Sequence, residues 1–278
     1  MEAAHFAAAL LSAVLHAGWN AAVKASTRPT EAMAAQLLVS AILVVPGLLW
    51  TGLPVQASWL WIAASTLMNI VTVAALLRAY ALGGFGIVYP VVRAVSVLLV
   101  VPLAAELAGD RLGLAPLAGI LLVTVSLGLL AYGAGRDRAF ATPALVWTVV
   151  AGLSTAAYVM CDAHGVRLAG SPIAYGFAVS VTNAAAMCWR QRHIGTPRQL
   201  LGANWPIAVP TAVAAVLSYL LILFVWTHAP IAPASALRDT SAVFAIVIAI
   251  AWLKEPFTPS RMLAVLLATA AVPLLRLA

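Results

Sequence analysis

The chain consists of long apolar stretches separated by short connections rich in Pro, Gly or charged residues. Ten of these stretches are close to the ~20 mostly apolar residues that a helix needs to cross the hydrocarbon core of a bilayer. No connection is long enough to house a soluble domain. The pattern therefore predicts an all-α integral membrane protein of about ten transmembrane helices. The predicted spans are residues 3–23, 32–50, 58–80, 87–105, 113–133, 143–162, 171–190, 205–227, 231–252 and 260–276.

The pattern is written twice, because residues 78–130 correspond to residues 223–275 at a constant offset of 145 positions. At this offset Arg93 aligns with Arg238, and each arginine lies inside a predicted span. The correspondence also sets one acid opposite another, Asp110 opposite Glu255.

The offset covers five predicted spans, an odd number, so the second copy is expected to cross the membrane in the opposite direction. Inverted repeats of this kind are common in secondary transporters, which bind their cargo near the middle of the bilayer. We therefore expect a single transmembrane domain, residues 1–278, made of two inverted five-helix repeats around a central cavity. The repeats would cover about residues 1–135 and 140–278.

Composition supports a membrane location. The chain is 64% hydrophobic and 8% charged, whereas a soluble domain carries about 25% charged residues. The formal net charge of +7 comes mainly from Lys and Arg in the short connections, so nucleic acid is not an expected partner. The connections between spans 1–2, 3–4, 5–6, 7–8 and 9–10 hold most of these cations. The positive-inside rule places that side in the cytoplasm, although an inverted repeat weakens the rule.

The order of spans and a few short motifs resemble the drug/metabolite transporter superfamily, and within it the ten-helix EamA-like exporters. The resemblance covers nearly the whole chain, and each motif is short and moderately specific. It implies a basket of helices around a cavity, export by alternating access, and amino acids or related metabolites as cargo. Related small multidrug exporters use a glutamate in the first helix, which this chain lacks. The motifs are His16, Ala17, Gly18, Trp19 and Asn20 with Lys24, then Gly109, Asp110 and Arg111, and Lys254, Glu255 and Pro256.

Polar side chains inside predicted spans are the candidates for substrate binding, because such groups are costly in lipid unless they meet a partner or a wet cavity. Helical spacing places several of them on shared stripes. Cationic, hydrogen-bonding and aromatic groups together suit a small zwitterion, with guanidinium for carboxylate and ring faces for ammonium. The candidates are His16, Trp19, Asn20, Asn69, Tyr80, Tyr89, Arg93, Tyr158 and Arg238.

Structural roles compete with these assignments. Each arginine could bind only helix-end carbonyls or acids, and His16 could be a hydrogen-bonded residue between helices rather than a proton carrier. Because Asp239 follows Arg238 whereas Ala94 follows Arg93, we expect Arg93 to be the unneutralised, ligand-facing cation and Arg238 the structural one.

Prolines near equivalent turns are candidate hinges, since proline removes a backbone donor and can kink a helix. Pro90 and Pro233 flank the turns before the fourth and ninth predicted spans. Prolines are also tolerated routinely in membrane helices.

The sequence favours a secondary transporter that exports small metabolites, with amino acids, including aromatic ones, as the leading cargo. Drugs, nucleosides or other metabolites are the alternative. A membrane enzyme or channel is less favoured, because no hydrolase, metalloprotease, nucleotide-binding or selectivity-filter motif is present. We expect no cofactor and no metal, and Cys161 and Cys188 are interpreted as packing residues. We expect the protein to be a monomer that binds a small molecule and lies in the lipid bilayer of a bacterial inner membrane.

Overall fold

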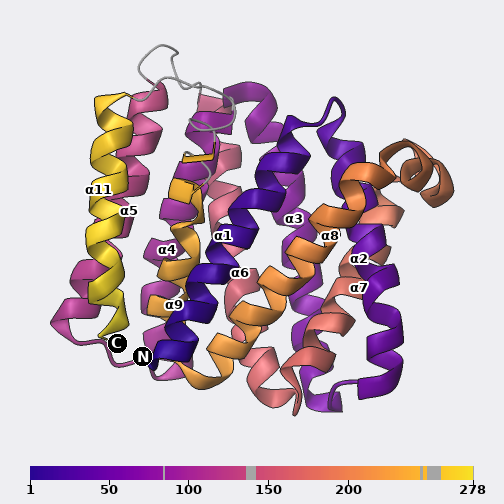
Figure 1. The fold of residues 1–278 in the computed structure, drawn as a ribbon, viewed down its shortest axis with the longest axis horizontal. Coiled ribbons are helices and arrows are strands. Elements are labelled where there is room, and N and C mark those ends of the chain that lie inside the picture. Colours follow the sequence, from indigo (N-terminus) through magenta and orange to yellow (C-terminus); the bar gives the residue numbers. More distant parts are fainter. Residues whose placement is uncertain (84, 136–141, 245–246, 249–257, 278) are drawn as a thin grey trace.

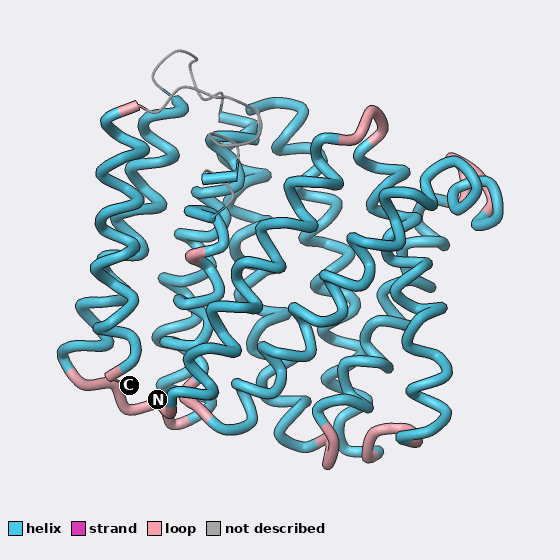
Figure 2. The backbone as a smooth tube through the Cα atoms, viewed as in Figure 1, coloured by secondary structure: helices cyan, strands magenta, loops and turns pink. Residues whose placement is uncertain are grey.

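The fold is a bundle of long helices. The structure, a computed structural model, describes residues 1–83, 85–135, 142–244, 247–248 and 258–277. Nearly all of these residues are helical, and none of them lies in a strand (Figure 2). The helices are α1 (Ala3–Ala25), α2 (Pro29–Thr51), η1 (Gln56–Ser58), α3 (Trp59–Gly83), α4 (Phe85–Ala108), α5 (Leu114–Gly135), α6 (Thr142–Leu168), α7 (Pro172–Gln191), α8 (Pro197–His228), α9 (Ile231–Asp239) and α11 (Pro259–Arg276) (Figure 1).

Length and hydropathy agree with a membrane protein. Six of the described helices, α1, α2, α3, α4, α6 and α8, are long and apolar enough to cross a bilayer. Shorter apolar segments occupy Leu114–Leu130 in α5 and Met262–Arg276 in α11. Large apolar side chains such as Leu49, Trp50 and Leu114 are exposed on the outside of the bundle, where lipid would cover them. The predicted all-α integral membrane fold is confirmed.

Both ends of the chain lie on the same face of the bundle (Figure 1). The N-terminal ammonium group of Met1 donates to the backbone carbonyl of Arg276 at 3.0 Å. A chain whose ends share one face crosses the bundle an even number of times, as the sequence predicts.

Local sequence explains where several helices begin and end. Ser171 and Thr196 cap α7 and α8 by accepting from the backbone N–H three residues later, and a proline follows each cap in the first helical position. Thr196 and Gln199 form a reciprocal capping box. Gly52 ends α2 with a φ of 76°, a conformation that residues with a Cβ rarely adopt.

Helix packing follows a paired arrangement. The contacts α3–α6 and α1–α8 are related by exchanging the two predicted repeats, and so are α2–α8 and α3–α7, and α4–α6 and α1–α9. The last helices of the two repeats, α5 and α11, pack against each other at one end of the bundle (Figure 1). This pairing favours two-fold symmetry, and the inverted repeat itself stays a prediction.

Several boundaries differ from the predicted ones. Helix α6 continues to Leu168, beyond residue 162, because small and polar residues there pack inside the bundle rather than in a connection. Helix α8 begins at Pro197, before residue 205, because the capping box starts it earlier. Residues 136–141 and 249–257 lie outside the described residues. They include Arg136, Arg138, Lys254 and Glu255 of predicted connections.

The predicted ninth span, residues 231–252, is not one regular helix. Helix α9 ends at Asp239, Thr240 forms a turn, and residues 241–244 are helical again. The backbone N–H of Thr240 is shared among three preceding carbonyls, which marks a locally tightened helix. Neither proline nor glycine occupies this position, so the break was not visible in the sequence.

Close packing between α4 and α6 depends on Gly152, and we expect Gly152→Ala to destabilise the bundle. A Cβ there would lie 2.6 Å from Cβ of Val95 and 3.2 Å from the carbonyl oxygen of Val92. Overpacking of this kind costs about 1–3 kcal/mol. Thermal unfolding of the purified protein in detergent measures the loss.

The matched control is Gly128→Ala on α5, because Gly128 is exposed and a Cβ there meets no atom within 4 Å. Alanine is the better helix former by up to about 1 kcal/mol, so this variant should unfold at the same temperature or higher. Equal losses in both variants would contradict the packing argument.

Candidate functional site

A cavity of about 540 Å³ lies among α1, α2, α3, α4, α6, α7, α8 and α9. This volume falls within the roughly 300–1,000 Å³ of small-molecule sites. Both predicted repeats contribute walls, since the lining runs from His16 on α1 to Arg238 on α9. The interior of the bundle therefore holds a site large enough for a metabolite.

The structure brings together all nine residues selected from the sequence. Each of them lines this cavity: His16, Trp19, Asn20, Asn69, Tyr80, Tyr89, Arg93, Tyr158 and Arg238. Ser12 on α1 and Trp226 on α8 do not line it. Ser12 instead joins α1 to α8 through hydrogen bonds with Ser218, and Trp226 belongs to the apolar core.

The cavity occupies one half of the bundle. It is lined by the end of α1, the start of α2, the end of α3 and the start of α4, and it reaches the exposed residue Pro29. These segments share the face that carries the α1–α2 and α3–α4 connections. The cavity therefore extends from the interior toward that face.

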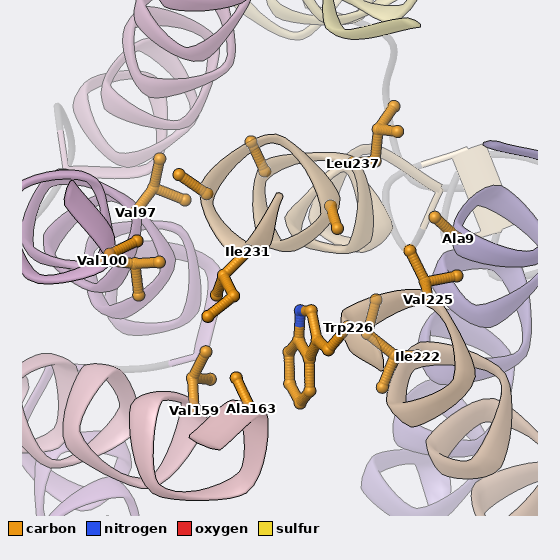
Figure 3. Close-up of a cluster of buried hydrophobic side chains, with 14 of the residues drawn as sticks. Ala9, Val97, Val100, Val159, Ala163, Ile222, Val225, Trp226, Ile231 and Leu237 are labelled. Carbon is orange, nitrogen blue, oxygen red and sulfur yellow. The ribbon is translucent and has the colours of Figure 1, made fainter. Parts of the chain in front are cut away.

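The other half of the bundle is filled by apolar side chains. Trp226 and Ile222 of α8 lie beside Ile231 of α9, with Val159 of α6 and Val97 of α4 close by (Figure 3). Trp226 is fully buried, and its indole N–H donates to the hydroxyl of Ser235 at 3.2 Å. This core separates the inner end of the cavity from the face that carries the chain termini.

The charged cluster at the inner end of the cavity is built around Arg93. Its Nη1 atom lies 3.0 Å from Oδ1 of Asp239, and both side chains are more than nine-tenths buried. Its Nη2 atom contacts the hydroxyl of Tyr89 and Nε2 of His16. Because a guanidinium can only donate hydrogen bonds, Nε2 of His16 is the acceptor and carries no proton in this arrangement.

The expectation that Arg93 is the unneutralised cation is wrong. Asp239 neighbours Arg238 along the chain, but successive side chains on a helix point about 100° apart. The carboxylate of Asp239 therefore turns away from Arg238 and reaches Arg93 on α4 instead. An acid of the second predicted repeat neutralises the arginine of the first.

Arg238 is the arginine without a close partner. Its guanidinium lies over the ring of Trp226, 6.0 Å from the centroid. Within the part of the chain that the structure describes, it has no hydrogen-bond or ion-pair partner, and its buried Nε is unsatisfied. The side chain is 6% exposed and lines the cavity. A buried cation of this kind favours an anionic group in the cavity.

Asp162 supplies a negative charge on the cavity wall. Its Oδ1 accepts from the hydroxyl of Tyr175 at 3.1 Å, and its Oδ2 accepts from Tyr219 at 2.8 Å. The hydroxyl of Ser65 is a further hydrogen-bonding neighbour of this carboxylate. Since a carboxylate can accept about four hydrogen bonds, capacity for one further donor remains. Asp162 could therefore take part in binding an ammonium group.

Neither predicted hinge proline lines the cavity. Pro233 lies in the first turn of α9, where its missing N–H removes no intrahelical hydrogen bond. Pro90 lies inside α4 and does remove one. The observed irregularity falls at Thr240, directly after the charged pair Arg238 and Asp239. That Pro90 and Pro233 act as hinges stays a prediction.

Sequence reasoning missed two buried amides in the cavity wall, Gln36 and Gln191. Gln36 lies one turn before Ser40 in a predicted span, and this spacing could have revealed it. Gln191 adjoins Arg190 and Arg192, so its sequence context indicated a solvated connection. In the structure it is the last residue of α7 and is 2% exposed.

Residues 142–277 match the EamA-like transporter family. The matched segment is just under half of the chain and is similar to EamA-like transporters. It coincides with the second predicted repeat and contributes Tyr158, Asp162, Arg238 and Asp239 to the site. The family consists of membrane transporters of small molecules rather than enzymes. The other cavity walls come from the part of the chain before the matched segment.

A comparison with solved structures concerns the fold of the whole chain. One solved crystal structure superposes on the protein with a TM-score of 0.74, at 16% sequence identity, over 98% of this chain and 95% of that chain. The likeness therefore extends beyond the matched segment to the whole bundle. No curated protein sequence matches the chain.

The buried ion pair predicts a large effect of Asp239→Asn on stability. The change leaves Arg93 charged and unpaired inside the bundle, and breaking a buried pair costs about 3–5 kcal/mol. We expect a marked drop in the thermal unfolding temperature in detergent.

The control is Glu31→Gln, which removes the acid of the exposed Arg28–Glu31 pair, 3.4 Å apart. Exposed pairs contribute at most about 1 kcal/mol, so this variant should unfold like the unmodified protein. If the two variants unfold at similar temperatures, the Arg93–Asp239 pair does not stabilise the bundle.

Proposed function

We propose that the protein is a secondary transporter that exports small metabolites, with amino acids as the leading cargo, by alternating access. The observation that carries this proposal is Arg238, a buried cation without a close partner on the wall of a cavity inside a membrane bundle. Charge at this depth is costly without a partner or a functional reason. A cargo carboxylate would satisfy it.

The remaining charges support a zwitterionic cargo. Arg93 and Asp239 neutralise each other, which leaves Arg238 and Asp162 as one cation and one anion on the wall. An α-amino acid carries the same two charges, so its carboxylate would lie at Arg238 and its ammonium group near Asp162. The rings of Tyr158 and Tyr219 add aromatic faces, which also attract ammonium groups.

The distribution of cavity and core supports alternating access. The cavity extends toward one face, and apolar packing around Trp226 fills the half toward the other. To expose the site to the opposite face, the apolar side chains around Trp226 would have to separate while the existing opening of the cavity closes. Two inverted repeats that exchange their arrangements would produce this change.

Direction and location follow from the same arrangement. The cavity extends toward the face whose connections hold most of the Lys and Arg, and the positive-inside rule assigns that face to the cytoplasm. Cytoplasmic cargo would then enter from inside, as export requires. We place the protein in a bacterial inner membrane, as a monomer. The length and pattern of spans also resemble the bacterial amino-acid exporter YddG.

The alternative cargo is another metabolite, a drug or a nucleoside. A permanently cationic drug fits less well, because Arg238 would repel it. Neutral nucleosides would leave Arg238 unpaired, and buried unpaired charge opposes binding.

Purified protein in liposomes should take up labelled amino acids in a saturable manner, and a panel of amino acids with and without a pH gradient would reveal both cargo and coupling. Protein-free liposomes are the control. Absence of uptake across the whole panel would exclude amino acids as cargo.

Arg238→Gln should raise the half-saturating concentration of a transported amino acid by at least about tenfold, the expected effect of losing a charge-assisted hydrogen bond. Uptake of the corresponding amino-acid amide, which has no carboxylate, should change less. Proteoliposome uptake of the two cargoes measures the difference.

Arg192→Gln is the matched control, because Arg192 also lies over a tryptophan, 4.1 Å from the Trp189 centroid, but is exposed and outside the cavity. It should leave both half-saturating concentrations unchanged. Equal losses for acid and amide in Arg238→Gln would assign Arg238 a structural role.

A further inference from the structure

The charged side chains that line the cavity lie on one side of it. Its charged side chains among the described residues are Arg93, Asp162 and Arg238, on α4, α6 and α9. The walls formed by α2 and α7 contribute no charged residue and are rich in amides and hydroxyls. The polar members of these two walls are Thr30, Gln36, Ser40, Ser180, Asn183 and Gln191.

The amides of these walls have unused hydrogen-bonding atoms. Oε1 of Gln36, Oδ1 of Asn183, and both Oε1 and Nε2 of Gln191 are buried and lack a hydrogen-bond partner within the described ranges. Gln36 and Gln191 are each 2% exposed. Buried polar groups are normally satisfied, and each exception calls for an explanation.

These side chains belong to one surface. On α2, Met33, Gln36 and Ser40 line the cavity at helical spacing, and on α7 Asn183 and Gln191 lie on the same helical face. The two helices pack together through Ala34 and Met187. Gln36 is held by a hydrogen bond from its Nε2 to Ser40 at 2.9 Å, which leaves its oxygen for another partner.

We propose that the α2–α7 amide wall, with Gln36 and Asn183 as its specificity-determining residues, selects cargo that carries an uncharged hydrogen-bonding group at its distal end. The inference rests on the proposed function. The α-carboxylate and ammonium groups, shared by all amino acids, lie at Arg238 and Asp162, and the side chain extends toward the amide wall. Carboxamide or hydroxyl side chains satisfy the buried amides, whereas an apolar chain of similar length leaves them unpaired.

Leaving such groups unpaired discriminates between two cargoes more strongly than a difference in cargo size does. A site built to hydrogen-bond a cargo group rejects the analogue that lacks it far better than an apolar pocket rejects an analogue of different size. Glutamine and methionine have side chains of similar length and differ in this property. The unmodified protein in liposomes should therefore show a half-saturating concentration for methionine at least about tenfold above that for glutamine.

The variants Gln36→Met and Asn183→Leu test the residues directly. Each should raise the half-saturating concentration of glutamine by about fivefold and leave that of methionine unchanged or lower. A folding defect would instead reduce the uptake of both cargoes in proportion. Gln56→Met is the matched control, because Gln56 is exposed on η1 and does not line the cavity.

The outcomes separate the two proposals. Uptake of both amino acids with equal half-saturating concentrations, or a preference for methionine, would overturn the amide wall and leave amino-acid transport standing. An unchanged glutamine-to-methionine ratio in both variants would also overturn it. If no amino acid enters the liposomes, transport of this cargo and the inference fail together.

Discussion

The buried pair between Arg93 and Asp239 is the interaction on which the site depends. An unpaired guanidinium inside a membrane bundle is expensive, and its neutralisation across α4 and α9 fixes these two helices relative to each other. It also decides the character of the cavity. Because Asp239 is hydrogen-bonded to Arg93, Arg238 lies over the face of Trp226 and, in our proposal, binds the cargo. A single hydrogen-bonded contact thereby assigns the two equivalent arginines different roles.

Packing complements this electrostatic arrangement. Small residues such as Gly152 let α4 and α6 approach closely, and the apolar core around Trp226 closes one half of the bundle. The opposite half holds polar groups that the packing leaves without partners. Stability and binding capacity are therefore separated along the axis of the bundle, although the same helices contribute to both.

Much of this arrangement was accessible from the sequence. Apolar run lengths predicted the helical membrane fold, because the bilayer imposes a narrow range of helix lengths. Polar residues at helical spacing predicted nine side chains that share one cavity, from His16 to Arg238, because lipid penalises any other placement. Both predictions rest on constraints that act locally along the chain.

Features that depend on contacts between distant segments could not be predicted from the sequence. The partner of Arg93 lies 146 positions away, and the residue adjacent to Arg238 gave the wrong assignment. Thr240 interrupts its helix without a proline or glycine to mark it. Gln191 lies between two arginines in the sequence and is nevertheless buried at the end of α7.

The ion pair also has an evolutionary consequence. Asp239 has no acidic counterpart in the first half, where Ala94 occupies the equivalent position. If the halves descend from one duplicated unit, an acid gained or lost in only one copy decided whether the arginine of the other copy has an ion-pair partner. Positions 93 and 239 should then vary together among descendants of this chain. Once the copies differed at this position, they could no longer be interchanged.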